Sequence, residues 1–487
     1  MAGWRLEQTY TQLPLIFYVD APPTPVRQPQ LVLFNKRLAT TLGLDPETLE
    51  TPAGAEIFAG NALPEGARPI AQAYAGHQYG HFTPLGDGRA ILLGEQITPS
   101  GERMDIQLKG AGQTRYSRRG DGRAALGPML REYIISEAMH ALGIPTTRSL
   151  AVATTGERVF RETVLEGAVL TRVAASHIRV GTVQWAAAHD DVEALRALAD
   201  YTRARHYPEL ADSMPGLKTR PTGEHYLALF GGIVERQARL IASWQLVGFI
   251  HGVMNTDNMA LSGETIDYGP CAFMDPYEPA TVFSSIDHGG RYAYGNQPSI
   301  AQWNLARLAE AMLPLFDDDP NRAVERATGV LDRFLEIFER HWLSGMRSKL
   351  GLFTEEADDQ ALADEVLAWM QRATADFTNT FRALTLDHAL SGGPDLDAWL
   401  ERWEARRERQ PHSRREVEDL MRRHNPAFVP RNHLVEAALR AATEDHDFSV
   451  LDRLLDALAK PYDHDRDLPE FTKPGPRDDR YRTFCGT

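Results

Sequence analysis

The sequence predicts an α+β fold in which a strand-rich N-terminal lobe precedes a larger helical C-terminal lobe and a helical C-terminal extension. Between about residues 85 and 175, short apolar runs typical of strands are separated by turns, and one helical pattern interrupts them. After about residue 185, apolar residues recur with the period of a helix over most of the remaining chain. A chain of 487 residues is also long for a single compact core, so two or more lobes are expected.

Four segments are expected along the chain. Residues 1–70 are expected to form an irregular N-terminal extension, because their short apolar runs are broken by prolines. Residues 71–180 form the strand-rich lobe and residues 181–350 the helical lobe. Residues 351–487 form a helical extension and a tail, whose role the sequence does not indicate.

Strands are expected at 89–95, 104–110, 149–154, 158–164 and 168–174. The one helix among them, at 128–142, has Pro128 near its start and Gly143 just past its end. Long helices follow at about 190–207, 224–250 and 298–350. A small strand-rich lobe with one helix, followed by a larger helical lobe, is the order of a protein-kinase-like bilobal fold.

Composition limits the function classes. Hydrophobic residues at 43% and charged residues at 24% are typical of an ordinary globular protein. A net charge of -15 gives no overall attraction to nucleic acid or to an anionic membrane, so neither is an expected partner. No apolar run approaches the roughly 18 to 20 residues that span a bilayer, and the N-terminus lacks a signal-peptide pattern. A cytoplasmic protein is therefore expected.

The first candidate phosphate-binding element is LGDGR, at 85–89. Gly86 and Gly88 would let backbone amides approach a phosphate closely, and Arg89 would add positive charge. A Gly-Asp-Gly tripeptide is also an ordinary hairpin turn, and that alternative stays open.

The second candidate is Lys109, which closes an apolar strand some twenty residues before a helix that carries Glu132 and Glu137. A strand lysine paired with a helix glutamate is the device by which kinases hold phosphate. A surface lysine at a strand end is the alternative. In the intervening loop, Asp121 and Gly122 lie among four basic residues, which favours a loop that faces phosphate over a solvated basic loop: Arg115, Arg118, Arg119 and Arg123.

The third candidate is HGVMNTDN, at 251–258, followed by IDYG, at 266–269. Kinases of small molecules place a metal-binding Asn and, later, a metal-binding Asp in such segments, and Asn258 and Asp267 take these positions after an expected short hairpin at 259–266. The usual catalytic aspartate is replaced by Val253. Asp257 is the only nearby acid that could accept a proton. Reading Asn258 and Asp267 as loop caps is the alternative.

His77 and His81 have the spacing of metal ligands on a helix, but the glycines around them favour a loop. A structural role is therefore expected, and no transition metal is assigned to them.

Longer segments carry a family resemblance. They run from about residue 74 to residue 311 and resemble signature segments of the selenoprotein O (YdiU) family of protein adenylyltransferases: YAGHQYG, PLGDGRAILLGE, DIQLKGAGQTRYSRRGDGRA, SEAMHALGIPTTRSLAV, TRVAASHIRVG, HGVMNTDNM, DYGPCAFMD, GRYAYGNQP and WNLARLAEA. The resemblance implies a pseudokinase-like protein that binds ATP in a flipped orientation and transfers AMP to Ser, Thr or Tyr hydroxyls of protein substrates. It also implies Mg²⁺ or Mn²⁺ as the metal.

Carried over by position, the resemblance gives each residue a role. Asp257 would be the proton acceptor, Asn258 and Asp267 the metal ligands, and Glu132 the partner of Lys109. The residues implied to contact ATP are Gly86, Gly88, Arg89, Lys109, Asp121, Gly122, Arg172, Arg179 and Asp267. UMP transfer from UTP is a close variant. A true kinase and an inactive nucleotide-binding scaffold remain the alternatives.

Only two cysteines occur, too few for a disulfide scaffold and without the spacing of a zinc site. Cys271 lies two residues beyond Gly269, and Cys485 lies in the C-terminal tail, where some members of the resembled family carry selenocysteine. We hypothesise a reversible disulfide between them that controls access to the site. Two unpaired thiols are the alternative.

Overall fold

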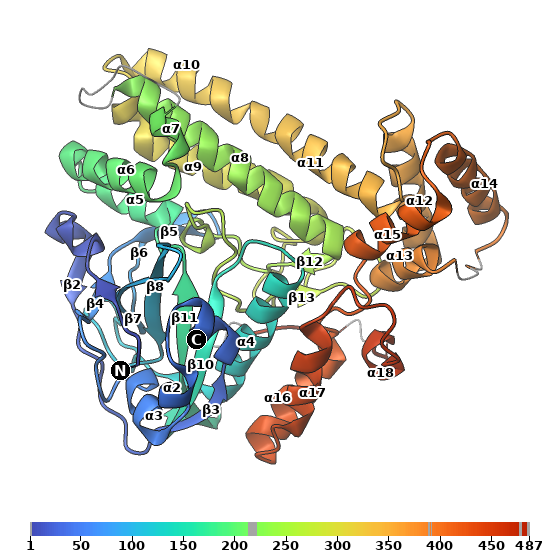
Figure 1. Ribbon diagram of the computed structural model, residues 1–487. Coiled ribbons are helices and arrows are strands. Elements are labelled where there is room, and N and C mark those ends of the chain that lie inside the picture. The colour runs from blue at the N-terminus through green and yellow to red at the C-terminus, as the bar shows by residue number, and fades with distance from the viewer. Residues whose placement is uncertain (1, 213–221, 388–389, 391, 477–479, 485–487) are drawn as a thin grey trace.

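The computed structural model describes residues 2–212, 222–387, 390, 392–476 and 480–484. The expected α+β composition is confirmed, since a large antiparallel sheet lies on one side and long helices cross the other (Figure 1). The sheet has nine strands in the order β2-β4-β7-β8-β11-β10-β3, with β1 paired to β7 and β9 paired to β11. Its strands are β1 (Leu6–Glu7), β2 (Tyr18–Asp20), β3 (Gln30–Phe34), β4 (Ile70–Gln72), β7 (Ala90–Ile97), β8 (Arg103–Lys109), β9 (Ala124–Ala125), β10 (Arg148–Phe160) and β11 (Val164–Ala174).

The first 70 residues are not an irregular extension, and that expectation is wrong. They supply three complete strands and the start of a fourth to the sheet, and β3 pairs with β10, so that Phe34 lies opposite Ala151. Three short helices cover one face of the sheet and close an apolar cluster there: α1 (Lys36–Thr41), α2 (Pro46–Leu49) and α3 (Pro52–Phe58). The prolines mark helix starts, because Pro46 and Pro52 stand in the first turns of α2 and α3.

Two strand predictions also need correction. The segments at 149–154 and 158–164 belong largely to the single strand β10, whose register with β11 shifts between Thr154 and Arg158. Gly156, with φ of +67°, lies within that irregularity. The turn to β11 then falls at 161–163. The expected hairpin at 259–266 has no paired strands of its own; Ala260 and Thr265 instead make isolated bridges to Arg179 and Thr146.

The helical part is held on the sheet by a shared core. The helix α4 (Leu126–Ala141) lies against β10 and β11, close to its expected position. The remaining helices up to residue 350 are α5 (Val180–Ala187), α6 (Val192–His206), α7 (Glu209–Asp212), α8 (Gly223–Val247), α9 (Gln297–Phe316), α10 (Pro320–Leu331) and α11 (Arg333–Lys349). One buried cluster joins residues of the sheet, α4, α8 and α9. No helix among the described residues is both long enough and apolar enough to cross a bilayer.

The C-terminal helices have two destinations (Figure 1). The first four pack with α11 around a second apolar cluster: α12 (Asp359–Ala373), α13 (Phe377–Thr385), α14 (Pro394–Glu408) and α15 (Arg414–His424). The next two return to the sheet side and pack on α4: α16 (Asn432–Glu444) and α17 (Ser449–Leu458). A last short helix is α18 (Pro469–Thr472). The expected segment boundaries stay predictions.

A lysine is buried beside the second cluster. Lys349 ends α11 and is 1% exposed, with its Nζ 4.1 Å from the ring centroid of Phe381 and 5.5 Å from that of Phe377. No charge among the described residues offsets this burial, since desolvation is the only influence on its pKa. Burial lowers the pKa of Lys349 to about 7.

Replacing this lysine should stabilise the protein. Between the folded pKa of about 7 and the higher unfolded value, the unfolded chain binds a proton that the folded chain does not, so the free energy of unfolding rises with pH. We expect Lys349→Met to raise the free energy of unfolding by about 2 to 4 kcal/mol at pH 7 and by much less near pH 10. Urea unfolding followed by tryptophan fluorescence, to which Trp399 and Trp403 of this cluster contribute, measures the change. The exposed Lys460→Met is the control, and an equal gain at both pH values would contradict the expectation.

Candidate active site

A cavity of about 780 Å³ lies where the sheet meets the helical part. It is lined by β7 and β8, by the loop before α4, and by the segment between β12 (Phe249–Ile250) and β13 (Ala272–Phe273). It brings together twelve sequence-predicted residues: Gly86, Gly88, Arg89, Lys109, Asp121, Gly122, Glu132, Arg172, Arg179, Asp257, Asn258 and Asp267. Residues separated by up to 181 positions in the chain therefore face one space.

The Gly-Asp-Gly loop is closely packed beneath the loop at 114–117. Gly86 has φ of +117°, and a Cβ there would lie 2.4 Å from Cγ of Tyr116. The side chain of Ser117 donates a hydrogen bond to the carbonyl of Gly88. The close packing of this neighbouring loop is thus by itself a reason for glycine at positions 86 and 88, whether or not a ligand binds there. Asp87 between them points inward, where burial raises its pKa to about 6.

The charged side chains of the basic loop at 115–123 have different partners. Arg118 and Arg119 line the cavity, and Arg118 Nη2 donates 2.7 Å to the carbonyl oxygen of Pro84. Arg123 also lines the cavity, although its guanidinium bonds to backbone oxygens of Thr24 and Pro25. Asp121 accepts two hydrogen bonds from Arg161, at 2.9 and 3.0 Å, which lower the pKa of Asp121.

Lys109 and α4 form a buried ion pair. Lys109 Nζ lies 2.5 Å from Glu132 Oε2, and both side chains are buried. Glu137 instead accepts two hydrogen bonds from Arg148, at 2.7 and 2.8 Å, and one from the backbone N–H of Ser149. The two glutamates on α4 therefore have different partners, and only Glu132 faces the cavity.

Three cations surround Asp267. Arg172 Nη1 and Arg179 Nη1 lie 2.5 and 3.0 Å from its carboxylate oxygens, and Lys109 Nζ lies 3.5 Å away. Burial alone would raise the pKa of Asp267, but the charges of Arg179, Arg172 and Lys109 hold it well below its ordinary value. Asp267 also has φ of +61°, which is uncommon for a residue with a side chain. Three of the positive charges that line the cavity therefore lie next to this one carboxylate.

Both arginines are held by side chains that the sequence interpretation did not single out. Gln107 Oε1, on β8, accepts hydrogen bonds from Nε and Nη2 of Arg172, at 3.1 and 2.5 Å. Cζ of Arg179 lies 4.5 Å from the ring centroid of Tyr74. Gln107 was hidden in a strand pattern that indicated only burial. Tyr74 begins the YAGHQYG segment, which carries the family resemblance but no chemical signal of its own.

Asp257 lies in the short helix η3 (Thr256–Asn258), beside the position of Val253. Burial raises the pKa of Asp257 to about 6, although the nearby charge of Arg179 opposes the rise. Asn258 donates its side-chain N–H to the carbonyl of Val253 at 2.9 Å, so its amide oxygen is available to a ligand. Asp257 and Asn258 follow each other in the chain, and both line the cavity together with Asp267.

The two histidines lie in a hairpin rather than a loop, formed by β5 (Ala75–Gln78) and β6 (His81–Pro84). His77 Nδ1 lies 2.8 Å from the side-chain nitrogen of Gln184, and its ring packs against Trp303. His81 is exposed. His77 thus contributes to packing, which is consistent with a structural role.

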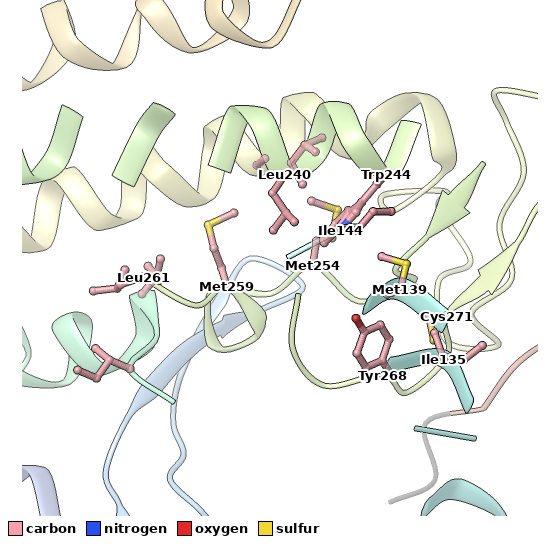
Figure 2. Packing of buried hydrophobic residues seen from close by; sticks show 14 of the residues in the cluster. Ile135, Met139, Ile144, Leu240, Trp244, Met254, Met259, Leu261, Tyr268 and Cys271 are labelled. Atoms are coloured by element: carbon pink, nitrogen blue, oxygen red, sulfur yellow. The ribbon is translucent and has the colours of Figure 1, made fainter. Parts of the chain in front are cut away.

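Cys271 is buried in the main core. Figure 2 shows it within the same apolar cluster as Ile135 and Met139 of α4 and Tyr268. Burial raises the pKa of its thiol to about 12, which disfavours the reactive thiolate. Cys485 lies outside the described residues, so the hypothesised disulfide stays a prediction. Thr483 donates a hydrogen bond of 2.7 Å to the carbonyl oxygen of Pro270, so the described end of the tail passes close to Cys271.

The two glutamates of α4 allow a paired test. We expect Glu132→Gln to raise the KM for nucleotide by about tenfold, because Lys109 loses the partner that fixes it in the cavity. We expect Glu137→Gln to leave that KM unchanged and to lower the melting temperature instead, because its partner Arg148 lies outside the cavity. Steady-state kinetics and thermal unfolding of both variants measure this. Equal effects on KM would contradict it.

Comparisons with known proteins agree over nearly the whole chain. The family model described as Protein adenylyltransferase SelO matches residues 3–459. A protein nucleotidyltransferase YdiU of Halalkalibacterium halodurans is 60% identical over 490 residues, which cover 100% of this chain and 98% of that relative. Proteins of the same name from Bacillus cereus (strain G9842) and Bacillus cytotoxicus are 58% and 59% identical, over 100% of this chain and 99% and 98% of theirs.

These relatives define the class of the protein. It is a nucleotidyltransferase that uses a nucleotide co-substrate and acts on a protein substrate. The chain belongs to the SelO family of protein adenylyltransferases.

Proposed function

We propose that the protein transfers AMP from ATP to Ser, Thr or Tyr hydroxyls of other proteins, in a reaction that requires Mg²⁺ or Mn²⁺. The strand-rich and helical parts would then be the lobes of a protein-kinase-like, or pseudokinase, fold with the nucleotide between them. The observation that carries the proposal is the meeting in one cavity of a buried carboxylate, Asp257, with the cations of Lys109, Arg172 and Arg179.

In the proposed reaction, the oxygen of the acceptor hydroxyl bonds to the α-phosphorus of ATP, and Asp257 accepts the proton that this hydroxyl loses. The bond from that phosphorus to the bridging oxygen breaks, and pyrophosphate leaves. With a pKa of about 6, Asp257 is mostly ionised at neutral pH and still basic enough to take the proton. Arg172 and Arg179, now turned to Asp267, would stabilise negative charge on the phosphates.

The residues present fit a hard divalent cation. The carboxylate of Asp267 and the amide oxygen of Asn258 are oxygen donors of the kind that Mg²⁺ and Mn²⁺ prefer. The described residues contain no group of three or more His, Cys, Asp or Glu that could hold a metal, so phosphate oxygens and water would complete the coordination. When bound, the ion supplies positive charge to the phosphate oxygens.

ATP labelled at different phosphates tests the proposal. Incubation with a protein substrate mixture and ATP labelled at the α-phosphate should leave label in protein, whereas ATP labelled at the γ-phosphate should not. Label retained only from the γ-position would favour a true kinase, and none from either would favour a scaffold. A parallel reaction with α-labelled UTP separates AMP transfer from UMP transfer.

A further inference from the structure

The hairpin formed by β5 and β6 lies against the loop that carries Asp257. The backbone N–H of His77 donates 2.7 Å to the hydroxyl of Thr256, and that of Tyr79 donates 3.2 Å to Oδ1 of Asn255. These two bonds flank Gln78 and join β5 to the residues just before Asp257. Hydrogen bonds from the backbone on both sides of Gln78 therefore hold this part of the hairpin beside the loop that carries Asp257.

Alternate residues of β5 and of the position just before it face the site. Tyr74, which precedes β5, shares one side with Gly76 and Gln78, as expected for positions two apart in extended chain. Tyr74 and Gln78 both line the cavity, and Tyr74 covers one face of the Arg179 guanidinium. His77, on the other side, faces α5 through Gln184.

Gly76 restricts the carboxylate of Asp257. A Cβ at position 76 would lie 2.2 Å from Oδ1 of Asp257, so only glycine lets this oxygen rest against the strand. That oxygen is buried, and no described residue donates a hydrogen bond to it. Proton transfer is thereby left to the other oxygen. Gln78, two residues further along the same side, lines the cavity together with Asp257.

We propose that this strand positions the two groups that face the α-phosphate, with Tyr74 orienting Arg179 and Gln78 orienting the reactive oxygen of Asp257. The inference rests on the proposed function and extends it, because it assigns roles to residues that do not themselves carry out the chemistry. Arg179 Nη1 also donates to the carbonyl oxygen of Asp257 at 3.1 Å, so the two positioned groups are linked.

Different kinetic constants test the two roles. Tyr74→Leu should raise the KM for ATP by about fivefold, whereas Tyr74→Phe, which keeps the ring face, should stay within about twofold of wild type. Gln78→Ala should lower kcat by roughly tenfold or more and leave the KM for ATP unchanged. In an Asp257→Asn background, Gln78→Ala should have no further effect on the residual rate. His81→Ala, on the exposed side of the same hairpin, is the control and should change neither constant.

An equal rise in the KM for ATP in Tyr74→Phe and Tyr74→Leu would overturn the role of Tyr74. A Gln78→Ala variant with normal kcat, or with an equal loss in the Asp257→Asn background, would overturn the role of Gln78. Binding of a fluorescent ATP analogue to each variant, measured apart from turnover, shows that the site is folded. If wild-type protein transferred no α-label, the proposed function and the Gln78 role would both fail, while the binding data would still decide the role of Tyr74.

Discussion

Asp257→Asn is expected to lower the rate of AMP transfer by about 10² to 10⁴, because the asparagine amide cannot accept the proton of the acceptor hydroxyl. Nucleotide affinity should change by less than about threefold, since the side chain keeps its shape and the cations around Asp267 are untouched. Single-turnover transfer of α-label, with affinity measured separately, checks both expectations.

The matched control is Asp87→Asn. Asp87 lines the same cavity and, like Asp257, has a pKa raised to about 6 by burial. Its Oδ2, however, accepts hydrogen bonds from the backbone N–H of Gln72 and the side chain of Gln107, both at 3.2 Å. We expect transfer to fall by less than about tenfold in this variant. A loss equal to that of Asp257→Asn would contradict the assignment of the proton acceptor.

Asp267→Asn should separate metal-dependent from metal-free nucleotide binding. The variant loses a proposed metal ligand, so we expect transfer to fall by about 10³ and its dependence on Mg²⁺ or Mn²⁺ concentration to weaken. It also removes the negative charge that Lys109, Arg172 and Arg179 now share. Binding of ATP in the presence of a chelator should therefore become tighter, by about threefold to tenfold.

Titration calorimetry with and without chelator measures these affinities. Asp121→Asn is the control, because Asp121 lies at the cavity edge and is paired with Arg161 rather than with the central cations. Its dependence on metal should match wild type. Weaker binding of ATP without metal in Asp267→Asn would show that the three cations do not face the phosphates.

The sequence predicted best those elements whose pattern is local. The strands β7 and β8 and the helices α4 and α8 lie close to their expected positions, because apolar periodicity and end signals such as Gly143 are contained within each element. The N-terminal strands were missed because they are short and are stabilised by partners far along the chain, as when Phe34 pairs with Ala151. Nothing within residues 1–70 marks such a partner.

In the candidate site, too, the sequence predicted the features that depend on local motifs and missed those that depend on long-range contacts. The motifs at 85–89 and 251–269 indicated residues that the fold does gather in one cavity, because short motifs specify chemistry locally. Gln107 was missed because only tertiary contacts show that a strand glutamine is buried against Arg172. The choice between Glu132 and Glu137 on α4 likewise depends on how the helix is rotated against the sheet. Sequence spacing alone leaves that rotation open.

The packing of α16 and α17 on α4 has a consequence for synthesis of the enzyme. The helix that carries Glu132 is supported from outside by residues far later in the chain, since Arg131 on the same helix pairs at 2.8 Å with Glu436 of α16, 305 positions away. A nascent chain that still lacks α16 and α17 leaves one side of α4 uncovered, beside the cavity that Glu132 faces. Folding around this helix during synthesis is therefore expected to be completed only after α16 and α17 have left the ribosome.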